Sequence, residues 1–428
     1  METDILIIGA GASGLSAAYE LSLVNKNFIV LEARDRIGGR IHSINDERFK
    51  GIVEAGAEFI HGELPVTNRL LEKAGIRHHR AEGKIWEVQN GKIIEKEEFV
   101  DRWGTLIKKL ETLEEDMPIS EFLTTYFPGE QYEDLRESAL DFTEGYNAAD
   151  STRASSFALR EEWENSDEQQ GRLDDGYIAL INYLAQSVTK SGNKILLSEV
   201  VKKVTWQKGK VEVLTNKGQH YTASKILITI PLGVWQAQGE IGHISFAPAL
   251  KEKTEAAQKM GFGGVIKINM QFKNNFWEED APNKMNNAGF IFNDGELPTW
   301  WTQEPIKNGQ LTGWIAGPRA AKLKNTEKSK IFDRALKTLA YVSGTTEDFI
   351  RENLVAHHIT NWMQEEFTRG AYSYATLDSH WAKTILAQPV EQTLYFAGEA
   401  LYNGTETGTV EGALANGRDV AHTIIVHS

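Results

Sequence analysis

The chain has 428 residues, and its 41% hydrophobic and 25% charged residues are typical of a globular protein. One core rarely grows that large, so two lobes are expected. The formal net charge of −14 argues against nucleic acid as a partner, because phosphate binding needs clustered lysine and arginine, but it suits a cationic partner. The absence of cysteine excludes disulfides, thiol nucleophiles and cysteine-bound metals.

No targeting or membrane segment is expected. The first apolar run begins at Asp4–Ile5 without a basic leader or cleavage site, and it predicts a strand. No stretch approaches the ~20 apolar residues of a membrane helix, and the C-terminus carries no anchor. We therefore expect a cytoplasmic protein without a membrane partner, and the sequence leaves its oligomeric state open.

The N-terminal residues predict a strand–helix–strand unit. Asp4–Gly9 is a short apolar run that stops at a glycine, Ala12–Val24 has helical spacing, and Phe28–Leu31 is a second apolar run ending at Glu32. Downstream, the apolar residues of Glu95–Pro118 fall on one face of a predicted surface helix, and Ile178–Val188 predicts another helix.

Strands dominate after Lys194. Val200–Trp206 and Lys210–Thr215 predict a hairpin, and Ile226–Ile230 is an apolar run closed by Pro231. In Val265–Phe272 the side chains alternate, which places Val265, Lys267, Asn269 and Gln271 on one side of a strand. The remaining predicted elements are a helix at Thr326–Val342, a strand at Leu394–Ala397 and a last helix from about Thr409.

Gly9, Gly11 and Gly14 form a G-x-G-x-x-G motif between the first strand and helix. The first glycine allows a tight turn, the second lets the backbone approach a pyrophosphate, and the third lets helix and strand pack closely. The helix N-terminus offers free amides to the phosphates. Glu32 follows Gly14 by 18 residues, where a carboxylate can bind ribose hydroxyls. The unit therefore predicts dinucleotide binding.

The residues after this unit carry a family resemblance. Glu32–Arg40 reads EARDRIGGR and resembles the E-A-x-x-R-x-G-G-R extension of the flavin-containing amine oxidase family, which implies FAD. Gly56–Gly62 (GAEFIHG) resembles a block of the polyamine and spermine oxidases in that family. Leu394–Ala421 resembles the closing flavin motif, so the resemblance runs from end to end.

The motif and the resemblance together assign the FAD-binding residues. They are Gly9, Gly11, Ala12, Ser13, Gly14, Glu32, Ala33, Arg34, Gly38, Gly39, Arg40, Gly56, Ala57, Glu58, Val201, Trp362, Gly398, Glu399, Thr409 and Val410. Trp362–Tyr374 resembles the segment that ends under the flavin ring. Monoamine oxidases carry the cysteine bonded to FAD at the position of Ala371, so alanine there predicts non-covalent FAD.

Four catalytic candidates follow from the resemblance. Lys267 resembles the family's flavin-facing lysine, whose ammonium can hold a water at the flavin and assist oxygen reduction. His61 is expected to orient the substrate or tune its protonation, since a histidine pKa lies near working pH. Tyr372 and Trp362 are expected to form a wall beside the flavin. Thr409 replaces the second aromatic wall of monoamine oxidases, which puts a full two-aromatic cage in doubt.

The remaining polar candidates are weaker. Glu58, Glu63, Glu161, Glu162 and Glu164 are expected to be solvated acids, although one or two of them could anchor the distal ammonium groups of a polyamine. The pairs His78–His79 and His357–His358 lack ligand spacing, so no metal is expected.

The sequence thus predicts an α/β protein with a discontinuous Rossmann-like FAD-binding domain (1–77, 194–245 and 380–428). An α+β substrate domain with a mixed sheet (78–193 and 246–379) completes it. The expected function is oxidation of a small cationic amine, a polyamine by preference, by hydride transfer to the flavin. Dioxygen is the expected acceptor, and the products are an aldehyde, an amine and hydrogen peroxide.

Four alternatives stay open. A monoamine oxidase is weakened by Ala371 and Thr409. An L-amino-acid oxidase would carry an arginine where Phe59 stands. A histone demethylase is disfavoured by the lack of a long helical insertion and of an extra N-terminal domain. A flavin-bound protein without oxidase activity is the fourth.

Overall fold

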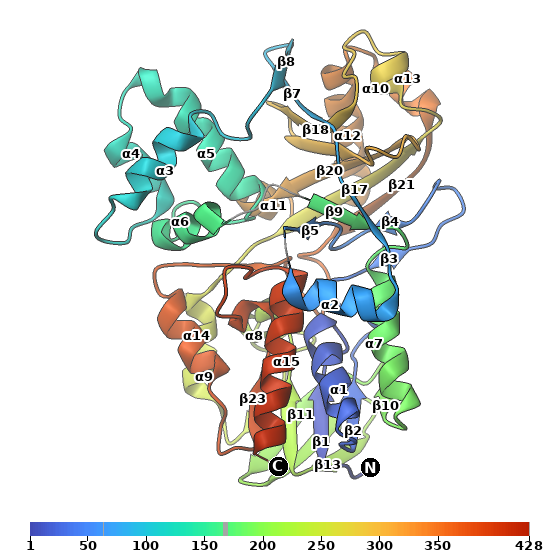
Figure 1. Ribbon diagram of the computed structural model, residues 1–428, viewed down its shortest axis with the longest axis vertical. Coiled ribbons are helices and arrows are strands. Elements are labelled where there is room, and N and C mark those ends of the chain that lie inside the picture. The colour runs from blue at the N-terminus through green and yellow to red at the C-terminus, as the bar shows by residue number, and fades with distance from the viewer. Residues whose placement is uncertain (63, 166–169, 428) are drawn as a thin grey trace.

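The computed structural model describes residues 1–62, 64–165 and 170–427. It shows the predicted α/β architecture in two lobes, with both chain ends at the base of the lower lobe (Figure 1). Among the described residues, no helix is long and apolar enough to cross a membrane.

A five-stranded parallel sheet forms the centre of the lower lobe, in the order β10-β2-β1-β14-β23. Its strands are β1 (Ile5–Ile8), β2 (Phe28–Leu31), β10 (Lys194–Leu196), β14 (Lys225–Ile228) and β23 (Leu394–Phe396). Nearly all of their residues are apolar because both faces of the sheet are covered. This confirms the predicted strand–helix–strand unit and the last strand.

Helices cover one face of this sheet and a second sheet covers the other. Side chains from alternate strand positions pack against α1 (Ala12–Leu23), α2 (Pro65–Ala74), α7 (Ile178–Lys190) and α15 (Val410–Val426). On the other face lie α8 (Leu232–Gln236), α9 (Lys251–Lys259), α14 (Ser379–Ala387) and a sheet of order β13-β12-β11-β15. Its strands are β11 (Val201–Gln207), β12 (Lys210–Thr215), β13 (His220–Ala223) and β15 (Ser245–Ala247); β11 and β12 form the predicted hairpin.

The upper lobe is built on a seven-stranded mixed sheet, in the order β21-β17-β20-β19-β18-β7-β8. The strands are β7 (Lys84–Gln89), β8 (Lys92–Lys96), β17 (Val265–Phe272), β18 (Ala288–Asn293), β19 (Thr299–Thr302), β20 (Gln310–Ala316) and β21 (Leu354–Asn361). Its apolar face packs against α10 (Phe276–Glu279), α11 (Gly317–Lys322), α12 (Lys328–Ser343) and α13 (Glu347–Asn353). The predicted alternation in β17 is confirmed: Ile266, Ile268 and Met270 lie in this core.

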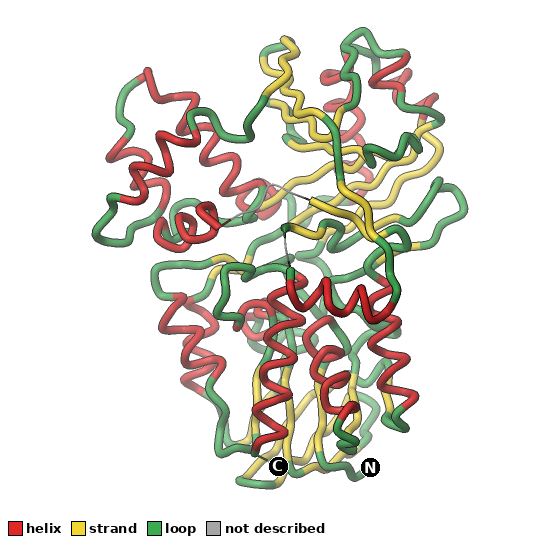
Figure 2. The backbone as a smooth tube through the Cα atoms, in the orientation of Figure 1, coloured by secondary structure: helices red, strands yellow, loops and turns green. Residues whose placement is uncertain are grey.

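Beside the sheet lies a small helical bundle, seen as a group of helices without strands in Figure 2. It contains α3 (Trp103–Glu111), α4 (Ile119–Tyr126), the 3-10 helix η1 (Glu130–Tyr132), α5 (Glu133–Gly145) and α6 (Ser156–Asn165). The predicted helix over Glu95–Pro118 is therefore wrong in extent, because β8 ends at Lys96 and only Trp103–Glu111 is α-helical. The charged residues between the two belong to a turn.

Short strands connect the lobes. They are β3 (Ser43–Ile44), β4 (Val53–Glu54), β5 (Ile60–His61), β6 (His78–Arg80), β9 (Gln170–Leu173), β16 (Gly261–Phe262) and β22 (Ser373–Tyr374); η2 (Glu399–Leu401) follows β23. The domain boundaries stay a prediction, but the packing of α7 and α9 places these two helices with the lower lobe rather than with the predicted substrate domain.

Candidate active site

A cavity of about 1140 Å³ runs between the lobes. The strand ends β1, β2 and β14 open into it from below, and β17 reaches it from above. All the residues that the sequence assigned to FAD line this cavity, and so do Lys267, His61, Tyr372 and Trp362. The structure therefore brings the predicted residues of seven separate chain segments into one space.

The glycine-rich turn is held in place by very close backbone packing. Gly9 has φ of +103°, a conformation that side chains disfavour. A Cβ on Gly14 would lie 2.0 Å from the carbonyl oxygen of Gly9, and Gly56 has equally little room against the Arg40 carbonyl. The turn can therefore bring its amides close to a ligand only with glycine at these positions.

The polar atoms around the turn fit a dinucleotide. Ser13 Oγ is buried and finds no partner among the described residues, so it is available to a pyrophosphate oxygen at the N-terminus of α1. The Glu32 carboxylate accepts hydrogen bonds from the backbone amides of Ala10 (2.7 Å) and Arg34 (2.9 Å). These bonds fix the carboxylate at the cavity wall, where its remaining acceptor capacity suits ribose hydroxyls.

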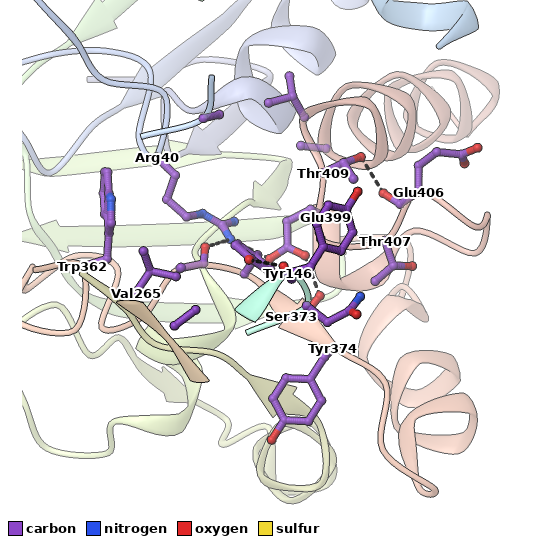
Figure 3. Close-up of a pocket in the computed structure, with 18 of the residues that line it drawn as sticks. Arg40, Tyr146, Val265, Trp362, Ser373, Tyr374, Glu399, Glu406, Thr407 and Thr409 are labelled. Atoms are coloured by element: carbon purple, nitrogen blue, oxygen red, sulfur yellow. Dashed lines mark hydrogen bonds and ion pairs between the residues drawn. The ribbon is translucent and has the colours of Figure 1, made fainter. Parts of the chain in front are cut away.

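Arg40 and Glu399 form an ion pair in the middle of the cavity wall (Figure 3). Arg40 Nη1 lies 2.7 Å from Glu399 Oε1 and donates at 2.8 Å to the carbonyl of Ala371. Ser373 donates to the other oxygen of Glu399 at 2.6 Å. The carboxylate of Glu399 thus joins three segments: the closing motif that contains it, the motif of Arg40 and the segment of Ser373.

Lys267 is the most buried charged side chain among the described residues that line the cavity, with 1% of its surface exposed. Its Nζ donates to Glu58 Oε2 at 2.7 Å and to the carbonyl of Gly56 at 3.1 Å. The other oxygen of Glu58 accepts from Arg172 Nε (3.0 Å), Trp301 Nε1 (3.0 Å) and Gln303 Nε2 (3.1 Å). Against the cost of its own burial, Lys267 and Arg172 hold the pKa of the Glu58 carboxyl at about 2.

Aromatic side chains form the wall beside Lys267. Trp362 is 3% exposed, donates to the carbonyl of Ala55 at 3.0 Å and packs near Val265 and Ala371. Tyr372 donates to the carbonyl of Tyr146 at 2.5 Å. Thr409 is the N-cap of α15, where its Oγ1 accepts from the amide of Gly412. A threonine in that structural position supplies no second aromatic wall.

The expectation for His61 needs correction. Burial lowers its pKa to about 4, so the ring is neutral near pH 7 rather than titrating there. No acid in the described part of the chain compensates for this burial; the ring lies edge-on to Tyr146, whose Oη is 3.4 Å from Nδ1. His61 can therefore accept or donate a hydrogen bond, but it stays uncharged while doing so.

Two of the five acids expected to be solvated are not. Glu58 is 7% exposed and fully paired, as described above. Glu162 faces the cavity, where burial raises its pKa to about 7. Asn147 Nδ2 donates to it at 2.6 Å, and among the described residues no cation pairs with it. Glu161 and Glu164 are exposed as predicted, and Glu63 lies outside the described residues.

The histidine pairs form no metal centre: within residues 1–62, 64–165 and 170–427 no group of three His, Asp or Glu side chains could hold an ion. Three important residues escaped the sequence analysis. Arg172, Trp301 and Gln303 come from segments without any motif, and only their packing around Glu58 reveals them. Tyr146 and Asn147, which complete the wall near Glu162, were missed for the same reason.

The family model "Flavin containing amine oxidoreductase" matches residues 12–425. The chain therefore belongs to the flavin-containing amine oxidoreductase family, and the predicted family and cofactor, FAD, are confirmed. This agrees with the cradle, where the glycine turn, Ser13 and Glu32 match the needs of the dinucleotide.

Among similar curated proteins are lysine-specific histone demethylase 2 of Homo sapiens and polyamine oxidase 2 of Arabidopsis thaliana. They are 28% and 27% identical, each over 97% of this chain, and the matches cover 52% and 86% of the relatives. The chain thus spans about half the length of the demethylase relatives. The fold also matches solved structures of putrescine oxidase bound to putrescine (TM-score 0.81, 19% identity) and of cyclohexylamine oxidase from Brevibacterium oxydans (TM-score 0.82, 18%). These cover 100% of this chain and 99% of the other.

Gly14→Ala should abolish FAD binding, because the added Cβ would lie 2.0 Å from the Gly9 carbonyl and push the turn open. The measurement is the flavin absorbance that co-purifies with the protein. Gly104→Ala is the matched control, since a Cβ at this helical position meets nothing within 4 Å. A yellow Gly14→Ala protein with full occupancy would contradict the proposed cradle.

The flavin should be released by acid precipitation, because Ala371 lines the cavity without a side-chain nucleophile and the chain has no cysteine. After the protein is pelleted with trichloroacetic acid, the yellow colour should be in the supernatant. Colour that stays in the pellet would show a covalent bond to another residue.

Proposed function

We propose that the protein is an FAD-dependent amine oxidase that acts on a small, cationic polyamine in the cytoplasm, with dioxygen as the electron acceptor. The observation that supports it is the convergence of the FAD cradle and the buried Lys267 on one cavity whose inner wall carries the uncompensated acid Glu162. The proposal keeps FAD non-covalent and gives Lys267, His61, Tyr372 and Trp362 contact with the substrate or the flavin.

When bound, FAD supplies the two-electron acceptor that takes hydride from the α-carbon of the amine. In balance, the amine, dioxygen and water give an aldehyde, a smaller amine and hydrogen peroxide. The protein needs no side-chain nucleophile for this chemistry. The buried Trp362 and the partly buried Tyr372 confine the carbon chain and limit the access of water to the reacting atoms.

The reacting amine must be neutral, and the neutral His61 suits this requirement. An uncharged imidazole can accept a hydrogen bond from the amine without repelling it. Tyr146 orients the ring from its edge at 3.4 Å. In this scheme His61 positions the amine, while a second, still protonated amine is bound elsewhere in the cavity.

Glu162 is the proposed anchor for that second ammonium group. Within residues 1–62, 64–165 and 170–427 its carboxylate has one donor, Asn147, and so keeps acceptor capacity for a cation. Burial penalises the charged carboxylate unless a cation reaches it. The acid therefore favours a diamine or polyamine over a monoamine.

An L-amino-acid substrate is disfavoured because the cation near Phe59, Arg172, is already bonded within the protein. The Arg172 guanidinium lies 4.4 Å over the Phe59 ring, where it could meet a carboxylate, but it is already bonded to Glu58, Thr302 and Glu304. A lysine-bearing peptide is the substrate that the name of the demethylase relatives suggests. We favour the small amine because the proposed anchor, Glu162, lines the cavity itself, where a small molecule can reach it.

Anaerobic mixing should identify the substrate class. Spermine, spermidine or putrescine should bleach the bound flavin faster than butylamine or an amino acid, because only the former place a second charge near Glu162. Stopped-flow absorbance measures the rate. Fastest bleaching by a monoamine or an amino acid would overturn the polyamine proposal, and bleaching by no amine would favour a flavoprotein without oxidase activity.

Glu162→Gln should weaken the binding of putrescine by roughly 10- to 100-fold, the equivalent of one charge-assisted hydrogen bond, and leave butylamine unaffected. The pKa of about 7 also means that the carboxylate forms as the pH rises through 7. Putrescine affinity of the unmodified protein should therefore increase from pH 6 to 8 more steeply than that of Glu162→Gln, in which only deprotonation of the reacting amine contributes.

Titration of the flavin absorbance gives the dissociation constants. Glu137→Gln, an exposed change of the same charge on α5, is the control and should behave like the unmodified protein. Equal losses for putrescine and butylamine in Glu162→Gln would exclude the anchor, while the amine oxidase proposal would stand.

A further inference from the structure

The carboxylate of Glu58 links the ammonium group of Lys267 to three hydrogen-bond donors, Arg172, Trp301 and Gln303, which we call the frame. Oε2 faces Lys267 alone at 2.7 Å, whereas Oε1 is held by Arg172, Trp301 and Gln303 at 3.0 to 3.1 Å. The three frame residues lie on β9, on β19 and just after β19. One oxygen therefore anchors the carboxylate and the other is free to orient the lysine.

We propose that Glu58 is a positioning residue for Lys267: it fixes the ammonium beside Gly56 so that the third N–H bond faces the cavity. This inference rests on the proposed function, in which Lys267 assists electron transfer to dioxygen. An ammonium has three donors, and Glu58 and the Gly56 carbonyl are its two acceptors among the described residues. Since Lys267 lines the cavity, the remaining donor is available there.

A flexible lysine chain needs such a partner. Its rotatable bonds give it many rotamers to lose, and a group that must act on developing charge works best when it is already in place. The cluster of Lys267, Arg172 and Glu58 has one positive charge in excess, which is the sign that stabilises electrons arriving at the flavin and at dioxygen. Glu54 also interacts with Lys267 and Glu58, and burial raises the pKa of the Glu54 carboxyl to about 7.

The chemistry of the position requires a carboxylate. Donors surround both oxygens of Glu58, so each oxygen must accept. An amide has one accepting oxygen and one donating nitrogen. In Glu58→Gln, the NH2 group must therefore face either Lys267 or the three frame donors, and three donors outnumber one. We expect the amide oxygen to stay with the frame and the NH2 group to displace Lys267 from its site.

The test compares Glu58→Gln, Lys267→Met and the double variant as holoenzymes. Flavin is reduced with dithionite, so that no amine is needed, and is then mixed with dioxygen, which takes two electrons and two protons to become hydrogen peroxide. Lys267→Met should slow reoxidation by roughly 100-fold, the order lost with one preorganised donor. Glu58→Gln should reproduce most of that loss, and the double variant should be no slower than Lys267→Met.

Sulfite provides a readout that does not depend on turnover. This anion bleaches the flavin when it binds, and a nearby ammonium favours it. If Glu58 positions Lys267, both single variants bind sulfite more weakly. If Glu58 only adds negative charge, Glu58→Gln binds sulfite more tightly, because Lys267 stays in place, and the proposal is overturned. The proposal would also be overturned if the double variant lost reoxidation rate by the product of the two single-variant losses.

Two further variants separate positioning from general damage. Glu137→Gln removes an exposed acid on α5, away from Glu58 and Lys267, so reoxidation and sulfite affinity should stay near those of the unmodified protein. Glu58→Asp keeps the charge and withdraws it by one methylene, which should give an intermediate loss even if Glu58→Gln does not fold. If no amine bleaches the flavin while the dithionite and sulfite results hold, the proposed function fails and the positioning role stands.

Discussion

Burial of the Lys267 ammonium is the constraint around which the upper wall of the cavity is organised. A lone buried cation would be expensive, so the chain must supply a counter-charge and hydrogen-bond acceptors at that depth. Glu58 supplies the charge, but a buried carboxylate needs its own donors, and these come from Arg172, Trp301 and Gln303. Satisfying one polar group has thus drawn four distant segments together.

The same logic explains why the cavity lies between the lobes. The lower sheet presents the carboxyl ends of its parallel strands, which is where a doubly wound sheet binds dinucleotides. The upper sheet presents the polar side of β17, where Lys267, Asn269 and Gln271 contact the chain between Lys50 and Gly56. The 42–62 region belongs to neither sheet. Its carbonyl groups at Glu54 and Gly56 accept hydrogen bonds from β17 of the upper lobe, and Gly56 packs against the Arg40 carbonyl beside the lower lobe. This region therefore fixes the separation of the two lobes.

The parts that could be predicted from sequence are those whose signal is local. The turn from Gly9 to Gly14 must be glycine-rich for backbone reasons, and the alternation in β17 follows from its two different faces. The boundary of α3 was wrong because a periodic apolar pattern also runs through a strand and a turn. The state of His61, Glu58 and Glu162 could not be predicted, since each depends on burial by residues far away in the sequence.

The difference between local signals and burial by distant residues also bears on substrate choice. The relatives divide between proteins named for histone demethylation and for polyamine oxidation. The cradle is common to both and so cannot separate them. The feature that can separate the two groups of substrates is the balance of charge on the cavity wall away from the flavin. Glu58 is an acid whose charge is already compensated by the protein, whereas Glu162 accepts a hydrogen bond from Asn147 and pairs with no cation among the described residues. An acid left in that state gains most from a compact cation that enters the cavity, and this is the physical basis for proposing a small polyamine as the substrate.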